Sequence, residues 1–220
     1  MAESERLLVF VRHGEAVSSQ DVWDADDQRP LTERGESAAQ RVAEEVAAFR
    51  PERLYSSPSL RARQTAARIA ERIGMEPELE PGLLERTFHS LEGLSLDEIA
   101  VRHGPAVLEA VHRRNTDGLV IGGDESFAAA VQRGRESVER LVSGPYRRVV
   151  AVSHGGPHCW AVSALCGIAP EARMFQLAEA HLTVLAFRLT SGGRPELSRI
   201  VAINTRPCRP PSGVVRSAGR

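Results

Sequence analysis

Residues 7–15 are Leu-Leu-Val-Phe-Val-Arg-His-Gly-Glu, five apolar residues followed at once by polar ones. A short continuous apolar run of this kind is typical of a strand buried on both faces, as in a parallel sheet. Open α/β sheets bind ligands at the carboxyl ends of their strands, which is where the polar residues begin here. This stretch therefore predicts both a central strand and the position of a functional site.

A second stretch late in the chain has the same arrangement. Residues 148–153, Arg-Val-Val-Ala-Val-Ser, are followed by His154-Gly155-Gly156, so that a histidine again stands where an apolar strand ends. Parallel strands place their carboxyl ends at one edge of a sheet. We therefore expect His13 and His154 to lie at the same edge.

The rest of the chain alternates strands and helices. Apolar residues at helical spacing and N-cap residues such as Thr32 predict helices, with Pro58 in the first turn of the second helix and 154–157 forming a turn. The predicted helices cover 33–49, 59–73, 95–114, 124–143 and 157–165, and further strands cover 53–55, 182–189 and 196–203. This order favours an α/β fold, a three-layer α/β/α sandwich with a mainly parallel central sheet.

One α/β domain is expected over residues 1–204, because 220 residues suffice for one large domain but hardly for two. Within it, a small lid insertion is expected at about 83–122. Residues 205–220 contain prolines, glycines and arginines without a periodic apolar face. We predict that they form a mobile tail.

The composition excludes several classes of protein. All 28 basic residues are arginine, so a Walker A loop and a Schiff-base lysine are excluded. The formal net charge of −1 gives no reason to expect a nucleic-acid partner. No apolar run reaches the roughly 18 residues of a membrane helix, and the acidic, polar start does not read as a signal peptide. We expect a cytoplasmic protein that binds neither nucleic acid nor membranes.

Basic side chains accompany the two histidines. Arg12 precedes His13, and Arg61 stands in the first turn of the helix that follows the second predicted strand. The guanidinium fork matches the geometry of phosphate oxygens, and imidazole can act as a nucleophile or as a donor. Two arginines and two histidines at one sheet edge predict a compact pocket for a phosphate dianion.

Four ordered segments agree with this prediction: 11–15 (Val-Arg-His-Gly-Glu), 30–33 (Pro-Leu-Thr-Glu), 56–66 and 152–155 (Val-Ser-His-Gly). They resemble the motifs of the histidine phosphatase superfamily, which includes the cofactor-dependent phosphoglycerate mutases. The resemblance spans roughly residues 7–190. It is specific because the segments occur in the family's order, whereas Arg-His-Gly-Glu alone would recur by chance.

The resemblance implies a role for each matching residue. His13 would be the nucleophile that forms a phosphohistidine, and Glu85 would protonate the leaving oxygen and later activate water. The phosphate would be bound by Arg12, Arg61, His154 and Gly155.

The departures from the family pattern fall around the leaving group. Ser19 stands where the family often has asparagine, and we expect it to contact the substrate. Arg113 and Arg114 come after the loop that contains Glu85. The mutases carry an arginine pair there that binds the substrate carboxylate, so Arg113 and Arg114 too are candidate substrate-binding residues. The mutases' lysine after this loop and their Thr-Gly pair are absent, which leaves the substrate open.

No metal and no cofactor are expected. His154, His158 and Cys159 would suit a metal only on one helix face, and 154–157 is expected to be a turn. The predicted function is therefore a metal-independent phosphatase acting on a small phosphorylated metabolite. Alternatives are mutase-type transfer between positions of a small phospho acid and a catalytically silent protein that binds phospho-ligands. The sequence leaves open whether the protein is a homodimer.

Overall fold

The computed structural model describes residues 5–18, 23, 28–113, 116–172, 175 and 177–205. Within these residues, six strands form one sheet in the order β3-β2-β4-β1-β5-β6. Strands β3, β2, β4 and β1 run parallel, whereas β5 is antiparallel to β1 and β6 is antiparallel to β5. The strands are β1 (Arg6–Arg12), β2 (Arg53–Ser56), β3 (Glu78–Leu79), β4 (Arg148–Ser153), β5 (Leu182–Leu189) and β6 (Pro195–Thr205). The prediction of a mainly parallel sheet is confirmed.

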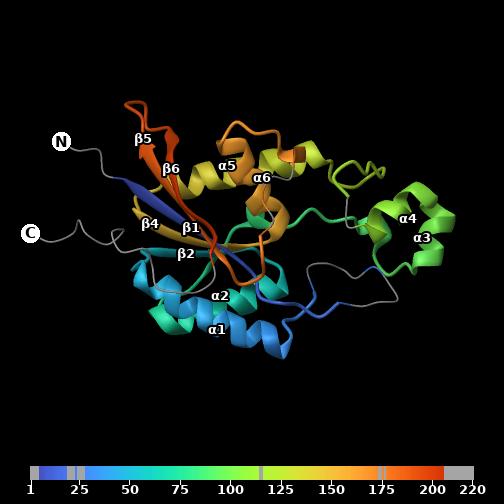
Figure 1. The fold of residues 1–220 in the computed structure, drawn as a ribbon, viewed down its shortest axis with the longest axis horizontal. Coiled ribbons are helices and arrows are strands. Elements are labelled where there is room, and N and C mark those ends of the chain that lie inside the picture. The colour runs from blue at the N-terminus through green and yellow to red at the C-terminus, as the bar shows by residue number, and fades with distance from the viewer. Residues whose placement is uncertain are drawn as a thin grey trace, which may run out of the picture.

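Helices cover both faces of the sheet (Figure 1). Helices α1 (Glu33–Ala48) and α2 (Leu60–Ile73) lie on one face, and α5 (Phe127–Ser143) and α6 (Gly155–Leu165) lie on the other. The expected three-layer sandwich is therefore confirmed. No helix among the described residues is both long and apolar enough to cross a membrane.

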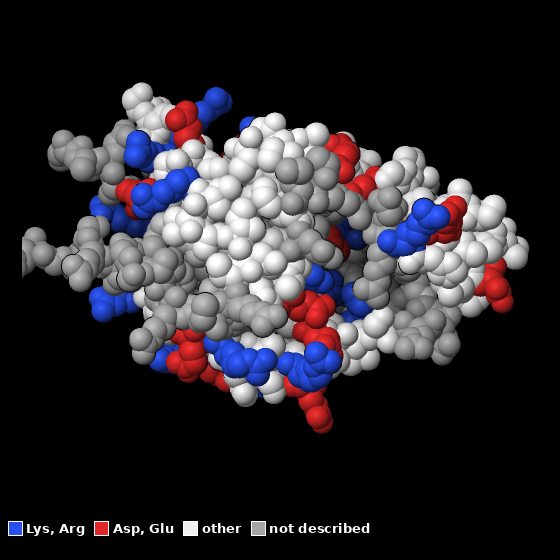
Figure 2. All heavy atoms as spheres, in the orientation of Figure 1, with Lys and Arg blue, Asp and Glu red and all other residues white. Residues whose placement is uncertain are grey.

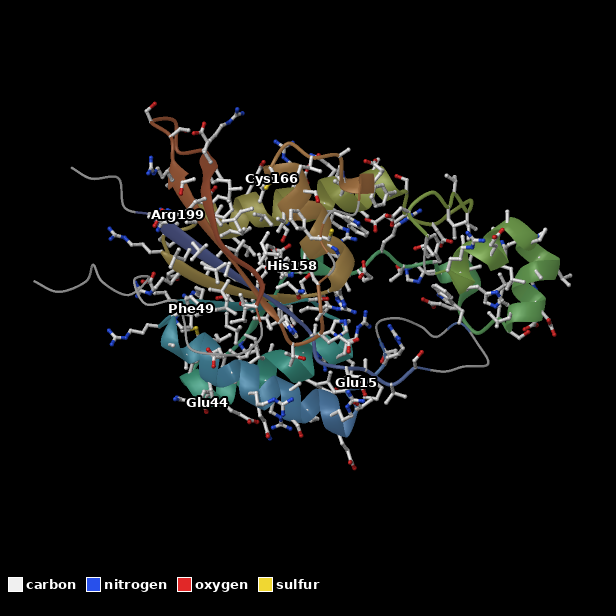
Figure 3. The ribbon with its side chains drawn as sticks, viewed as in Figure 1. Glu15, Glu44, Phe49, His158, Cys166 and Arg199 are labelled. Atoms are coloured by element: carbon white, nitrogen blue, oxygen red, sulfur yellow. The ribbon has the colours of Figure 1, made fainter. Side chains whose placement is uncertain are left out.

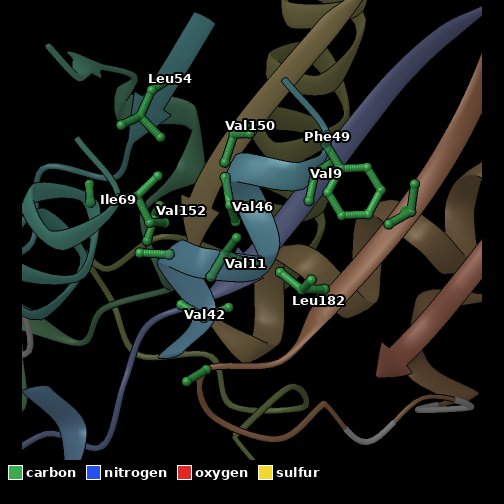
Figure 4. Close-up of a cluster of buried hydrophobic side chains, with 14 of the residues drawn as sticks. Val9, Val11, Val42, Val46, Phe49, Leu54, Ile69, Val150, Val152 and Leu182 are labelled. Carbon is green, nitrogen blue, oxygen red and sulfur yellow. The ribbon is translucent and has the colours of Figure 1, made fainter. Parts of the chain in front are cut away.

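Strand β1 is buried on both faces, which explains its unbroken apolar run. Leu7, Val9 and Val11 join the hydrophobic cluster under α1 and α2 (Figure 4), whereas Leu8 and Phe10 join the cluster under α5 and α6. Successive side chains of a strand point to opposite faces, so all five positions must be apolar. Each face of β1 therefore packs against a separate hydrophobic cluster.

Three predicted helix starts can be compared with the structure. Thr32 caps α1 as expected, because its Oγ1 accepts the Gly35 N–H at 3.0 Å. Helix α2 has Ser59 as its N-cap, so Pro58 precedes the helix instead of lying in its first turn. Helix α6 begins at Gly155 with His154 as its N-cap, so the turn predicted at 154–157 is wrong.

The predicted helix 95–114 is two helices, α3 (Leu96–His103) and α4 (Pro105–His112). The break falls at Gly104, whose φ of +88° is accessible to glycine, and at Pro105, which cannot continue a helix. Short 3-10 turns occur at Pro81–Leu83, His89–Leu91 and Pro170–Ala172. Strand β3 was not among the predicted strands.

Helices α3 and α4 lie at one end of the molecule, away from the sheet (Figure 1). They share a hydrophobic cluster of their own, made of Phe88, Leu91, Leu94, Ile99 and Val111. We call this part the α3–α4 lobe. Trp23, which comes after β1 in the chain, is bound to this lobe by two backbone hydrogen bonds. The Trp23 N–H donates to the Leu94 carbonyl at 2.9 Å, and the Trp23 carbonyl accepts the Gly93 N–H at 2.9 Å.

Candidate active site

Three adjacent parallel strands end at the same place. The His13 N–H donates to the Ser153 carbonyl at 2.9 Å, and the Ser57 N–H donates to the Val152 carbonyl at 2.9 Å. These bonds extend the sheet by one residue beyond β1 and β2. Figure 2 shows a hollow between the sheet and the α3–α4 lobe, with basic side chains at its floor. The two histidines are thus brought to one sheet edge, as predicted.

Arg61 joins the two histidines. It projects from the first turn of α2, is 1% exposed, and donates from Nε to His13 Nε2 at 3.0 Å and from Nη2 to His154 Nδ1 at 2.9 Å. The centroids of the two imidazole rings lie 5.0 Å apart. The predicted Arg–His cluster therefore forms around one buried guanidinium.

The protonation state of His13 follows from its partners. Its Nδ1 lies 2.7 Å from the Gly14 carbonyl oxygen, which can only accept, so Nδ1 carries the proton and Nε2 carries the lone pair. Burial, followed by the charge of Arg61, holds the pKa of His13 well below its ordinary value. The ring is therefore neutral at physiological pH, with a nucleophilic nitrogen facing Arg61.

His154 is held by two serines. Because Nδ1 accepts from Arg61, Nε2 carries the proton and donates to Ser57 Oγ at 2.8 Å, with Ser59 Oγ at 3.2 Å. Burial and the Arg61 charge lower the pKa of His154 well below its ordinary value. The sequence assigned no role to Ser57 or Ser59, although both belong to the segment 56–66 that resembles a family motif.

Further arginines lie near the histidines. Arg12 donates to the Leu177 carbonyl and pairs with Glu179 at 3.5 Å. Its guanidinium carbon is 3.4 Å from where a Cβ on Gly155 would stand, so it lies against the start of α6. The charge of Arg29 also lowers the pKa of both histidines, and sequence reasoning did not identify this residue. The site is strongly positive and suits a dianion.

Glu85 reaches the same end of α6. Its Oε2 accepts the Gly156 N–H at 3.1 Å, and its Oε1 accepts the Arg86 N–H at 3.1 Å. The first N–H groups of a helix have no partner within it, so the Gly156 N–H is available to bind the Glu85 carboxyl group and fix its position. Gly156 must lack a side chain, because a Cβ would lie 2.2 Å from Glu85 Oε1 and 2.8 Å from the Trp160 ring.

Glu15 binds the N-cap residue of α1. Its Oε1 accepts the Thr32 hydroxyl at 3.0 Å, and its carbonyl accepts the Thr32 N–H at 2.9 Å. Gly14 and Gly35 pack so closely that a Cβ on Gly14 would lie 2.6 Å from the Gly35 carbonyl oxygen. Figure 3 shows Glu15 on the side of the sheet that faces the α3–α4 lobe. These contacts dock the loop after β1 onto the start of α1.

Three predicted substrate-binding residues are not joined to this cluster by any described contact. Arg113 lies at the end of α4, is mostly exposed, and pairs with Glu109 at 2.7 Å. Ser19 and Arg114 lie outside the described residues, as does the tail predicted at 205–220 apart from Thr205, which ends β6. Within the described part of the chain, no three His, Cys, Asp or Glu side chains are grouped as a metal ion would require.

Comparison with known proteins agrees with the geometry. The model of the histidine phosphatase superfamily, branch 1, matches residues 8–201. A metal-independent phosphoserine phosphatase from Arabidopsis thaliana is 33% identical over 68% of this chain. The chain spans 64% of that relative, which is less than two thirds of the relative's length. A 2,3-bisphosphoglycerate-dependent phosphoglycerate mutase from Methylobacterium radiotolerans is 30% identical over 85% of this chain and 91% of its own.

A solved structure has the same fold. The mycobacterial glucosyl-3-phosphoglycerate phosphatase superposes with a TM-score of 0.73, at 25% sequence identity, over 91% of this chain and 99% of its own. The sheet and its helical layers therefore have a counterpart in that protein.

Proposed function

Because this chain belongs to branch 1 of the histidine phosphatase superfamily, we propose that it hydrolyses a small phosphorylated metabolite through a phosphohistidine at His13. One observation supports this most strongly. The Nε2 lone pair of a neutral His13 lies within 3.0 Å of the Arg61 guanidinium, so a nucleophile and a phosphate-binding cation share one buried pocket. Such a pair is what phosphoryl transfer to nitrogen requires.

In the first half-reaction, His13 Nε2 attacks phosphorus while the bond to the ester oxygen breaks. The lone pair must be free for attack, so the Nε–H of Arg61 turns from the imidazole to a phosphate oxygen when the substrate binds. Arg12 binds another oxygen and stabilises the charge of the transition state, while His154, whose N–H is donated to Ser57, holds the Arg61 guanidinium through its Nδ1. Glu85 donates a proton to the departing alkoxide, which leaves as an alcohol.

In the second half-reaction, water attacks the phosphohistidine. Glu85, now a carboxylate, accepts a proton from this water, and the bond between phosphorus and His13 Nε2 breaks. Inorganic phosphate leaves, and the neutral imidazole and protonated Glu85 are restored. Charge neutralisation by arginine in both steps makes a metal or cofactor unnecessary, in agreement with the name of the plant relative.

A mutase is the second candidate, because one relative is a phosphoglycerate mutase. The mutases' lysine and their Thr-Gly pair are absent from this chain, which favours water over a second phospho acid as the acceptor.

A substrate panel tests the proposal. Phosphoserine, 3-phosphoglycerate and a neutral sugar phosphate are each incubated with the protein, and both inorganic phosphate and the isomer of phosphoglycerate are measured. The proposal expects phosphate release, with phosphorylated acids favoured as in the phosphoserine and glucosyl-phosphoglycerate phosphatases. Isomer without phosphate release indicates a mutase, and binding without turnover indicates a silent phospho-ligand-binding protein.

A further inference from the structure

Glu85 stands on a stretch of chain that has no helix or strand of its own. Residues 84–88 are irregular, between the 3-10 turns Pro81–Leu83 and His89–Leu91. A general acid must be held to within a fraction of an ångström, and irregular backbone does not supply the hydrogen bonds that would do so. Two arginine side chains supply hydrogen bonds around this stretch: Arg133 binds the residues that precede Glu85, and Arg86 binds the loop that precedes α5.

Arg133, on α5, binds the chain that leads into Glu85. Its Nη1 donates to the carbonyls of Gly82 and Leu84, each at 3.0 Å. Its Nε and Nη2 form a bidentate pair with the Glu125 carboxylate at 2.7 and 2.8 Å. One side chain thus fixes the peptide group just before Glu85 and the loop that precedes α5.

Arg86, directly after Glu85, binds the other side of that loop. It is 7% exposed, and its guanidinium lies 4.6 Å from the centre of the Phe88 ring. Its Nε donates to the Glu125 carbonyl at 2.8 Å, and Nη1 and Nη2 donate to the carbonyls of Thr116 at 2.9 Å and Leu119 at 2.6 Å. Glu125 therefore connects the two arginines, by its carboxylate on one side and its carbonyl on the other.

We propose that Arg86, Glu125 and Arg133, here named the arginine network, are positioning residues that hold the Glu85 carboxylate against the start of α6 for leaving-group protonation. This proposal rests on the proposed function of Glu85 as general acid. The described hydrogen bonds of His13 are with Gly14, Ser153, Arg61 and Ala180, and its ring contact is with His154. None of these residues belongs to the network. Disrupting the network should therefore impair proton donation and spare attack by His13.

The choice of ester separates these two effects. An alkyl phosphate must be protonated as its alkoxide leaves, whereas p-nitrophenyl phosphate releases a phenolate that hardly needs a proton. Phosphoenzyme formation is measured by rapid quench on each ester for wild type, Arg133→Met and Arg135→Met. Arg135 is the matched control, because it stands on the same helix, is mostly exposed and pairs only with Glu139 among the described residues.

Arg133→Met should slow phosphorylation by the alkyl ester by about 10- to 100-fold, the effect of a small misplacement, and change the aryl rate by less than about twofold. Arg135→Met should match wild type on both esters. In Glu85→Gln, which already lacks the acid, adding Arg133→Met should cause no further loss on the alkyl ester. Arg133→Lys should not restore the alkyl rate, because an ammonium cannot replace the guanidinium fork.

Equal losses on both esters would overturn the positioning role and leave the proposed phosphatase function standing. So would a double variant, Glu85→Gln with Arg133→Met, that loses more rate on the alkyl ester than Glu85→Gln alone. A wild-type protein that forms no phosphoenzyme from either ester would instead contradict the proposed function. Amide hydrogen exchange gives a reading independent of turnover: Arg133→Met, or Glu125→Gln if the former does not fold, should speed exchange at residues 84–86. Unchanged exchange there would also overturn the proposal.

Discussion

His158 gives a stability prediction that follows from the burial of one side chain. It lies on α6 in the interior of the molecule (Figure 3), is 1% exposed, and stacks on Phe10 with ring centroids 4.5 Å apart. Neither ring nitrogen has a hydrogen-bond partner among the residues that the structure describes. Burial, followed by the charge of Arg12, lowers the pKa of His158 from 6.5 to about 3. The folded protein therefore holds this imidazole neutral.

The consequence for stability is set by proton uptake in the unfolded chain. Between pH 6.5 and pH 3 the unfolded state binds a proton at His158 and the folded state does not, so stability falls as the pH falls. At about 1.36 kcal/mol for each unit below 6.5, acidification from pH 7.5 to pH 5.0 costs about 2 kcal/mol through this residue. His158→Leu, similar in volume and unable to take a proton, should lack that loss.

The assay is urea unfolding of wild type and His158→Leu at pH 7.5 and pH 5.0, followed by circular dichroism. The variant should lose about 2 kcal/mol less than wild type between the two pH values, while other acid-sensitive groups act equally on both proteins. His112→Gln, at the exposed end of α4, is the control and should behave as wild type. The same loss in His158→Leu and wild type would refute a neutral, buried His158.

Three further predictions concern the site. Arg61→Ala should lower kcat on an aryl phosphate by about 10²–10³-fold, the usual effect of losing one preorganised donor. An unchanged kcat in steady-state assays would show that Arg61 does not bind the phosphate. Gly156→Ala should slow alkyl more than aryl esters, since its Cβ would displace the Glu85 carboxylate; equal rates of phosphate release for wild type and variant would argue against that placement. Activity should survive EDTA, and restoration of lost activity by a divalent ion would show that the mechanism depends on a metal.

Much of the fold was predictable because the two main strands are buried on both faces. An apolar run such as residues 7–11 has few alternatives when it ends in polar residues, and the structure places it at the centre of the sheet. The juxtaposition of His13 and His154 follows from the same argument. The prediction of one helix over 95–114 missed the break at Gly104-Pro105, although proline at a first helical position marks a new start.

Other features depend on contacts between distant residues. The start of α6 at Gly155 could not be read from two glycines, which are weak helix formers; Glu85 and Arg12 lie against these glycines from far along the chain. Arg86 and Arg133 look like ordinary surface arginines in the sequence. In the folded protein, the loop that precedes α5 supplies carbonyl partners for Arg86 and the Glu125 carboxylate for Arg133.

The covalent intermediate tests the central claim most directly. The protein is mixed with a labelled phosphate ester, quenched within the first turnover at alkaline pH, digested, and mapped by mass spectrometry. A base-stable, acid-labile phosphoryl group should be found on the peptide that contains His13, and His13→Ala should yield none. A phosphoryl group on the His154 peptide, or undiminished labelling of His13→Ala, would contradict the assignment of His13 as the nucleophile.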